Sequence, residues 1–196
     1  TDVLSDYAKL PSSAKVFGVT ATTPQVPFAV KIAQTLKGKV DKLILGGPHT
    51  SLMHSAAKRE KERNFVGSDR ATRDIKQLLN FYDVLVCGDG ELAIFEAFKI
   101  EKGIVDADDR HSPLFLNNEQ FTTFPLPARH LVDVESYKYQ IEGENAISLI
   151  AQLGCPFFCT FCSGRNSPFL RKIRTRGTDA VIKEIEHLYL KYGFKA

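Results

Sequence analysis

Three short apolar segments, each followed by a glycine-containing loop, place the strongest constraint on the fold. These segments are residues 15–20, 42–46 and 83–87. Stretches with helical spacing of apolar residues follow them, at 24–36, 52–81 and 91–101. Strand and helix signals that alternate in this way predict a parallel α/β sheet with helices on both faces. The sequence therefore predicts an incomplete, Rossmann-like, doubly wound parallel sheet in the first half of the chain.

The loops after these segments are candidate ligand-binding elements. They read Val19–Gln25, which is rich in threonine, Gly46-Gly-Pro-His-Thr50 and Gly88-Asp-Gly-Glu91. In open α/β sheets, ligands bind outside the carboxyl ends of the strands. Glycines there permit positive φ angles and close approach of the backbone to a ligand. Simple turn chemistry explains either glycine loop equally well when that loop is considered alone.

The pattern breaks from Lys102 to about Gly143, where Asp and Asn mix with Pro113, Pro125 and Pro127. We interpret this region as a linker between domains with little regular structure. Residues 114–116 and 120–123 flank Asn117-Asn118 and could form a small hairpin.

A second unit begins near Ala146. Residues 146–152 are a candidate strand, and a cysteine-containing loop follows. Residues 178–192 carry apolar side chains on one helical stripe, and Gly193 follows as the expected end of this helix.

Three of the four cysteines, Cys155, Cys159 and Cys162, fall within eight residues. Three thiolates at this spacing can converge on one metal centre. Structural zinc sites and all-protein [4Fe–4S] sites usually take four protein ligands. If these three cysteines hold a [4Fe–4S] cluster, one of its irons has no protein ligand. The alternatives are a zinc site with a distant fourth ligand and unligated thiols. Cys87 ends an apolar segment and is expected to be a buried structural thiol.

The motif Cys-x3-Cys-x2-Cys, with Phe161 just before its last cysteine, resembles the signature of the radical S-adenosylmethionine (SAM) superfamily. The resemblance implies that Cys155, Cys159 and Cys162 ligate a [4Fe–4S] cluster. It also implies that SAM binds the fourth iron and is cleaved reductively to a 5′-deoxyadenosyl radical. Phe161 and Arg165 would lie at the SAM site, with Arg165 near the SAM carboxylate. Members of this superfamily have a full or partial (β/α) barrel, with the motif after its first strand.

The three loops of the first half and the sequence Phe124-Pro-Leu-Pro-Ala-Arg129 resemble, in this order, the cobalamin (B12)-binding domain of B12-dependent radical SAM enzymes. By that resemblance the residues lining a cobalamin site are Thr20, Thr22, Thr23, Gly46, Gly47, His49 and Gly88. His49 could instead make a hydrogen bond across a turn. The sole Asp-x-His is Asp109-Arg-His111, which has Leu114 in place of the family's glycine. No histidine lower ligand is therefore expected.

The predicted organisation is a cobalamin-binding-like domain at 1–102, a linker at 103–143, and the first βα unit of a radical SAM barrel at 144–196. The first strand and helix of the B12-binding-like domain and the later barrel strands are expected to be absent, so the chain is predicted to be an inactive fragment of a larger enzyme. The parent reaction is expected to be radical-based methyl transfer or rearrangement. The alternatives are a radical SAM protein whose first domain is a scaffold without cobalamin, and a non-catalytic zinc-binding module.

The composition is 43% hydrophobic and 25% charged, with a net charge of +3. The sequence shows no basic stripe with interleaved aromatics and no apolar run of about 20 residues, so neither nucleic acid nor a membrane is an expected partner. Clustered thiols without a secretory signal favour a reducing, cytoplasmic location. The expected partners are a small-molecule substrate and an electron donor such as flavodoxin or ferredoxin. The basic residues Arg171, Lys172, Arg174 and Arg176 could hold the SAM carboxylate or an anionic substrate, but a solvated loop is the favoured expectation for them.

Overall fold

The computed structural model describes residues 10–63 and 69–196. Two compact units are present. The first, called the α/β unit below, contains the described residues up to Phe115 together with the segment Pro156–Arg171. The second, called the C-terminal unit, contains Leu116–Cys155 and Lys172–Ala196.

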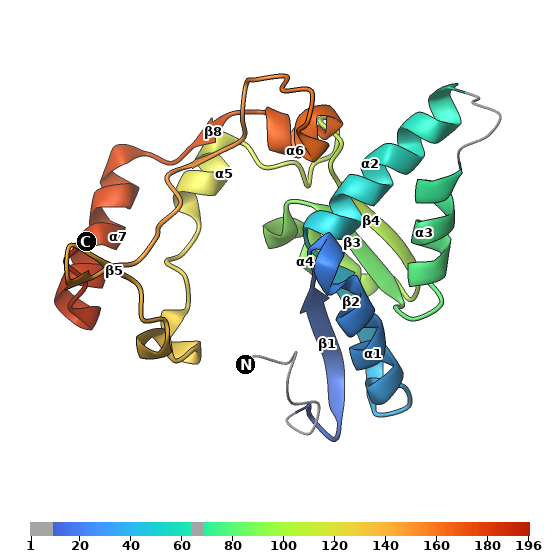
Figure 1. The fold of residues 1–196 in the computed structure, drawn as a ribbon, viewed down its shortest axis with the longest axis horizontal. Helices are drawn as coiled ribbons and strands as arrows, with labels where there is room; N and C mark the ends of the chain where they lie inside the picture. The colour runs from blue at the N-terminus through green and yellow to red at the C-terminus, as the bar shows by residue number, and fades with distance from the viewer. Residues whose placement is uncertain (1–9, 64–68) are drawn as a thin grey trace. The chain divides into compact units, whose positions relative to one another are not determined.

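The α/β unit is built on a four-stranded parallel sheet in the order β1-β2-β3-β4 (Figure 1). Its strands are β1 (Ala14–Thr20), β2 (Val40–Gly46), β3 (Val84–Gly88) and β4 (Gly103–Ala107). The three apolar segments of the sequence are therefore confirmed as strands of one parallel sheet. The order contains no reversal among the described strands, so the structure supports a Rossmann-like sheet without showing a doubly wound topology.

Helices connect these strands, as the alternating pattern predicts. They are η2 (Thr23–Gln25), α1 (Val26–Leu36), α2 (Pro48–Arg63), α3 (Arg70–Leu78) and α4 (Gly90–Lys99). The segment that follows Cys155 adds the short helices η5 (Ser163–Asn166) and α6 (Pro168–Arg171) to the same unit.

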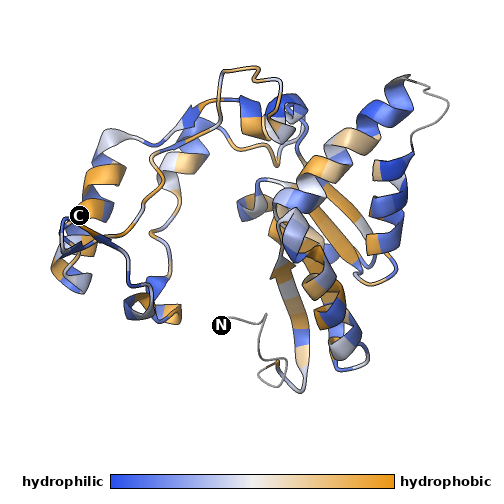
Figure 2. Cartoon of the chain, in the orientation of Figure 1, coloured by the Kyte–Doolittle hydropathy of each residue, from blue (hydrophilic) through white to orange (hydrophobic). Residues whose placement is uncertain are grey.

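Two hydrophobic clusters cover the two faces of the sheet. Leu43, Leu45 and Leu85 face one cluster, which takes apolar side chains from α1 and α3. Ile44 and the valines of β3 face the other, which takes Ala93 and Ala97 from α4. Successive strand residues point to opposite faces, so strands buried on both sides must be apolar throughout. Figure 2 shows this hydrophobic colouring on the sheet strands.

The C-terminal unit contains short elements and one long helix. They are α5 (Asn118–Thr123), η3 (Arg129–Leu131), η4 (Val134–Ser136), β5 (Gln140–Ile141), β6 (Glu144–Asn145), β7 (Gln152–Leu153), β8 (Arg174–Thr175) and α7 (Thr178–Tyr192). The predicted helix 178–192 is confirmed at both ends. Gly193 follows it with φ of 70°, a left-handed conformation in which glycine has no Cβ clash.

Three expectations for the middle of the chain differ from the structure. The hairpin predicted around Asn117-Asn118 is wrong: residues 118–123 form α5, because Asn117 caps it by accepting a hydrogen bond from the Gln120 amide at 2.8 Å. Residues 103–107, assigned to the linker, form the edge strand β4. The strand expected at 146–152 is reduced to β7, which pairs with β8 in antiparallel fashion, so a barrel is not shown.

None of the helices within residues 10–63 and 69–196 combines the length and the apolar character that crossing a bilayer requires.

Candidate functional site

The carboxyl ends of β1, β2 and β3 come together at one edge of the sheet. Thr20 at the end of β1 lies opposite Gly46 at the end of β2. A Cβ placed on Gly46 would lie 3.8 Å from the Cβ of Val86, near the end of β3. The structure thus brings the loops that contain Thr20, Gly46 and Gly88 to one edge, where ligands of open α/β sheets bind.

Gly47 packs directly against the loop that follows β1. Its φ is +100°, and a Cβ there would lie 2.5 Å from the Thr20 Oγ1 and 2.8 Å from the Ala21 nitrogen. The Ala21 amide donates to the Gly46 carbonyl at 3.1 Å, and the His49 amide donates to the Ala21 carbonyl at 3.1 Å. Contact between the two loops therefore requires a glycine at position 47 whether or not a ligand binds.

Gly88 has a similar role at the end of β3. Its φ is +93°, and a Cβ there would lie 2.5 Å from the Asp108 nitrogen just beyond β4. The Gly88 amide donates to the Ser51 Oγ at 2.9 Å, which ties this loop to α2. Close packing of the protein on itself therefore explains Gly88 as well.

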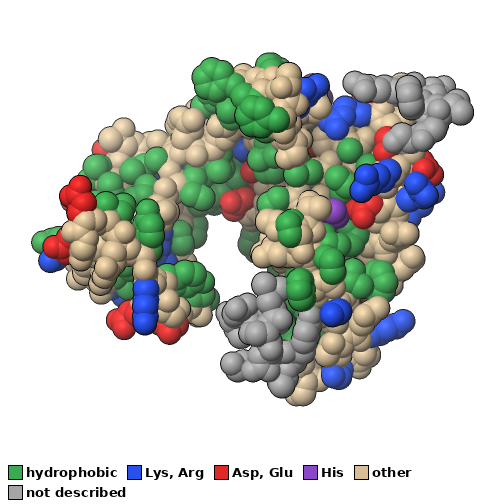
Figure 3. All heavy atoms as spheres, in the orientation of Figure 1, with side chains coloured by type: hydrophobic (Ala, Val, Ile, Leu, Met, Phe, Trp, Pro, Cys, Tyr) green, Lys and Arg blue, Asp and Glu red, His purple; other side chains and the backbone are tan. Residues whose placement is uncertain are grey.

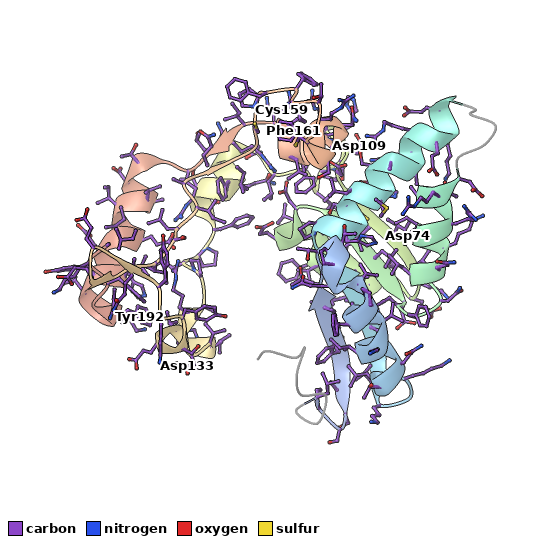
Figure 4. The ribbon with its side chains drawn as sticks, in the orientation of Figure 1. Asp74, Asp109, Asp133, Cys159, Phe161 and Tyr192 are labelled. Atoms are coloured by element: carbon purple, nitrogen blue, oxygen red, sulfur yellow. The ribbon has the colours of Figure 1, made fainter. Side chains whose placement is uncertain are left out.

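His49 joins two elements by its side chain. It is buried, with its Nδ1 3.1 Å from the Thr23 Oγ1 and its Nε2 2.9 Å from the Asp74 Oδ2. Asp74 belongs to α3 and is labelled in Figure 4. A carboxylate can only accept, so Nε2 carries a proton, and in the neutral ring Nδ1 accepts from the threonine hydroxyl. Asp74 has no distinguishing sequence signal, because nothing in the polar stretch 52–81 marks one carboxylate over the others.

The predicted threonines of the first loop lie at the surface of this edge. Thr20, Thr22 and Thr23 are all exposed. The Thr22 amide and hydroxyl both donate to the Gln25 Oε1 at 2.9 Å, in a capping arrangement that starts η2. Thr22 and Thr23 therefore already make hydrogen bonds within the protein.

Two carboxylates at the end of β4 were missed, because this strand had been assigned to a linker. Asp106 accepts from the His54 Nε2 and the Lys58 Nζ, both at 2.9 Å. Burial raises the pKa of Asp106, but these hydrogen bonds and charges outweigh it and hold the pKa well below its usual range. Asp108 is fully buried, and burial raises its pKa above the ordinary value.

The predicted metal-binding cysteines are free and exposed. Cys159 and Cys162 belong to the α/β unit, and Cys155 is the last residue of a segment of the C-terminal unit. The Cys162 amide donates to the Cys159 carbonyl at 3.1 Å, which closes a turn between these two predicted ligands. Cys87 is buried, and burial raises the pKa of its thiol, in agreement with a structural role.

The donor set fits a thiolate-bound cluster, since three thiols without disulfide partners are available. Across the described ranges 10–63 and 69–196, however, no three His, Cys, Asp or Glu side chains are grouped closely enough to hold a metal ion. The ligation of a cluster by Cys155, Cys159 and Cys162 therefore stays a prediction.

The phenylalanines beside the cysteines do not shield them from solvent. Phe157, Phe158 and Phe161 are 69%, 74% and 91% exposed. Figure 3 shows hydrophobic side chains at the top of the view, and Figure 4 labels Phe161 and Cys159 in that region.

Arg171 fixes the start of the cysteine segment. Its guanidinium stacks over the Phe158 ring at 3.6 Å. It donates from Nη2 to the Pro156 carbonyl at 2.6 Å and from Nη1 to the Phe157 carbonyl. Arg165, predicted to bind the SAM carboxylate, donates from Nη1 to the Thr160 carbonyl at 3.2 Å. The expectation of a solvated Arg171 is wrong, because its side chain binds this backbone.

A buried ion cluster organises the C-terminal unit. Glu184 of α7 is 1% exposed and accepts from the Arg129 Nη2 at 2.5 Å and from the Arg176 Nη1. Burial alone would raise the pKa of Glu184, but both arginines lower it on balance. Arg174 is also buried, so the predicted solvated loop is wrong at Arg174 and Arg176. The arginine of Pro-Leu-Pro-Ala-Arg129 thus holds α7.

Comparison with curated proteins finds two distant relatives. An uncharacterised methyltransferase of Pyrococcus horikoshii is 26% identical over 210 residues, in an alignment that covers 97% of this chain and 40% of the relative. The anaerobic magnesium-protoporphyrin IX monomethyl ester cyclase of Cereibacter sphaeroides is 23% identical over 216 residues, which cover 98% of this chain and 32% of that protein. The chain thus spans only about a third to two-fifths of the length of these relatives.

No protein-family model matches the chain, and no solved structure matches it significantly. The two relatives carry the names of enzymes, a methyltransferase and a cyclase. These names, together with the α/β sheet and the loops at its carboxyl edge, suggest that the chain comes from an enzyme, such as a methyltransferase or a cyclase.

Proposed function

We propose that this chain is part of a radical SAM enzyme that binds a [4Fe–4S] cluster through Cys155, Cys159 and Cys162. The observation that carries the proposal is a set of three free, exposed thiols at this spacing, with no fourth cysteine beside them in the sequence. Support comes from the alignment of nearly the whole chain with a relative named as a methyltransferase. The proposed parent reaction is radical-based methyl transfer or rearrangement of a small-molecule substrate.

The residues of the segment have distinct tasks in this proposal. Cys155, Cys159 and Cys162 supply three thiolates. When bound, a cluster with one open iron supplies the electron that cleaves SAM. Arg171 fixes the backbone between the first two cysteines, because it binds the Pro156 and Phe157 carbonyls. Phe161 and Arg165 are proposed to contact SAM, and a flavodoxin or ferredoxin is the proposed electron donor.

Iron and sulfide analysis after anaerobic reconstitution tests the cluster. The wild-type chain is expected to bind about four irons. Cys159→Ala should lose the cluster and its visible absorbance, because two thiolates cannot hold it. Cys87→Ala is the matched control and should keep the cluster, since the Cys87 thiol is buried in the sheet. A colourless protein that binds stoichiometric zinc instead would refute the proposal in favour of a zinc module.

The α/β unit is proposed to bind cobalamin at the edge formed by the loops of Thr20, Gly46 and Gly88. His49 would orient Thr23 there, because its other nitrogen is fixed by Asp74. These loops all follow the carboxyl ends of parallel strands, so one planar ligand could span them.

A scaffold without cobalamin is the second candidate for this unit. The close packing of Gly47 and Gly88 on neighbouring backbone favours it, because that packing alone accounts for both glycines. Spectrophotometric titration of the full-length enzyme with hydroxocobalamin separates the two. Saturable binding that Thr23→Ala weakens supports the cobalamin site. Absence of binding by the folded wild type supports the scaffold and leaves the cluster proposal intact.

A further inference from the structure

The segment that carries Cys159 and Cys162 is anchored to the α/β unit by a buried carboxylate that the proposed function does not use. This carboxylate is Asp108, the residue that follows β4. Its Oδ1 accepts from the Ser167 Oγ at 2.9 Å and from the Phe169 amide at 2.8 Å. Both donors lie in the nine residues after Cys162.

The Asp108 backbone is itself fixed from two sides. Its amide donates to the Asp106 Oδ1 at 2.9 Å. On the other side its nitrogen packs against Gly88, where the positive φ and the absence of a Cβ allow close contact. Asp106 is held in turn by the His54 and Lys58 side chains of α2. The Asp108 carboxylate therefore binds the cysteine segment from a residue whose own backbone is held by Asp106 and packed against Gly88.

A second contact joins α2 to the same segment. The Ser55 Oγ donates to the Asn166 carbonyl at 3.2 Å. Ser55, Ser167 and Asp108 are all buried, at 5%, 1% and 0% exposure. The segment after Cys162 is therefore docked on the α/β unit through buried polar contacts rather than through loose surface contacts.

Capping of the short helix α6 alone does not account for a fully buried carboxylate. A serine or asparagine accepts the same amide hydrogen bond without the cost of burying a charge. The second oxygen, Oδ2, is buried and has no hydrogen-bond partner among the described residues. Because Oδ1 accepts from both the Ser167 hydroxyl and the Phe169 amide, Asp108 holds the segment at two points rather than capping one amide.

We propose that Asp108 is a positioning residue that sets the cysteine segment relative to the glycine loops of the sheet edge. The inference rests on the proposed function. In that function, Asp108 holds the Cys159–Cys162 turn at the sheet edge that is proposed to bind cobalamin. Asp108 acts on the cysteines through Ser167 and Phe169.

Two measurements on the full-length enzyme test this. The first is amide hydrogen exchange of residues 167–171 without any cofactor, which reads the anchoring alone. The second is the electron paramagnetic resonance (EPR) spectrum of the reconstituted, reduced enzyme with and without SAM, which reads the cluster. Asp108→Ala should speed exchange at Phe169 at least about tenfold, because its amide loses the Asp108 Oδ1 as its acceptor. It should also reduce the fraction of cluster that responds to SAM.

Asp109→Ala is the matched control, because Asp109 is the exposed neighbour and its side chain accepts from the nearby His111 amide. It should leave both measurements unchanged. Asp108→Asn keeps an oxygen acceptor and should restore most of the protection. If Asp108→Ala does not fold, Ser167→Ala removes one of the two donors and should speed exchange in the same segment.

Unchanged exchange in both the Asp108→Ala and Ser167→Ala variants would overturn the anchoring. Faster exchange with an unaltered response to SAM would overturn the positioning role and leave Asp108 as a helix cap. A wild-type enzyme that takes up no iron would instead refute the proposed function, and the exchange data, measured without cofactor, would distinguish this failure from the other two.

Discussion

Glu184 stabilises the C-terminal unit through its buried ion pairs. It is buried in α7 between two guanidinium groups, those of Arg129 and Arg176. The Arg129 Nη1 is buried without a hydrogen-bond partner among the described residues, so Glu184 supplies the counter-charge for this arginine. Removing one member of such a cluster leaves a buried charge uncompensated.

Glu184→Ala is therefore expected to destabilise the C-terminal unit by about 3–5 kcal/mol, the usual cost of breaking a buried ion pair. Urea unfolding monitored by circular dichroism measures this loss. Glu186→Ala, at an exposed site on the same helix, should change the stability by less than about 0.5 kcal/mol. Equal effects of the two substitutions would show that the ion cluster contributes nothing beyond helix propensity.

The same residue predicts a pH dependence. The pKa of Glu184 is lower in the folded protein than its ordinary value of 4.5. The folded state therefore favours the ionised form, so this stabilisation is fully present above pH 4.5 and is lost as the pH falls below it. Unfolding midpoints of the wild type and of Glu184→Gln, measured from pH 7 downward, should converge in acid. A constant difference between them would contradict the assignment.

Interactions between side chains that lie far apart in the sequence could not be predicted from the sequence. Arg129 and Glu184 are 55 positions apart, and His49 and Asp74 are 25 apart. No periodicity links such positions, so the partners of Arg129 and His49 were not foreseen, and Arg176, which also binds Glu184, was expected to be solvated. The three cysteines could be recognised as candidate ligands because they lie within eight residues of one another. Their binding of one shared metal centre stays a prediction.

Among the elements, the loops after β1 and β2 form one packed layer rather than two independent ligand-binding loops. Gly47 makes this possible, because its hydrogen faces Thr20 and Ala21 at distances that exclude any side chain. The packing of these two loops therefore depends on the close contact of Gly47 with Thr20 and Ala21.

Gly47→Ala should destabilise the α/β unit by about 1–3 kcal/mol, since alanine resists the positive φ and its Cβ collides with the Thr20 loop. Gly18→Ala is the matched control. Gly18 lies inside β1, and a Cβ at this position would have nothing within 4 Å, so alanine there should be neutral or slightly stabilising. Thermal unfolding of the two variants provides the comparison. A Gly47→Ala variant as stable as the wild type would mean that the loops are not packed as described.

Elements with a strong hydrophobic period were predictable, and those without one were not. The strands β1 to β3 and the helix α7 follow from their patterns, because burial on two faces or on one stripe dictates which positions are apolar. The short helix α5 was mistaken for a hairpin, because Asn117-Asn118 suits a turn as well as a helix cap. Residues 146–152 have a strand-like composition, yet only β7 finds a pairing partner.

At the scale of the whole molecule, the cysteine motif is shared between the two units. Cys155 ends a segment of the C-terminal unit, and the next residue, Pro156, belongs to the α/β unit. The sequence had placed all three cysteines in the second domain. The structure gives the segment with Cys159 and Cys162 to the unit that carries the glycine loops, because Asp108 and Ser55 bind it there.

In the proposed enzyme, three thiolates leave one iron of the cluster free for SAM. The EPR spectrum of the reduced, reconstituted full-length enzyme tests it directly when recorded before and after addition of SAM. Direct coordination of SAM predicts a clear shift of the cluster signal, which S-adenosylhomocysteine, lacking the sulfonium, should not reproduce in full. A cluster signal that stays unchanged while SAM binds at equilibrium would contradict this coordination, because every iron would then already have its ligand.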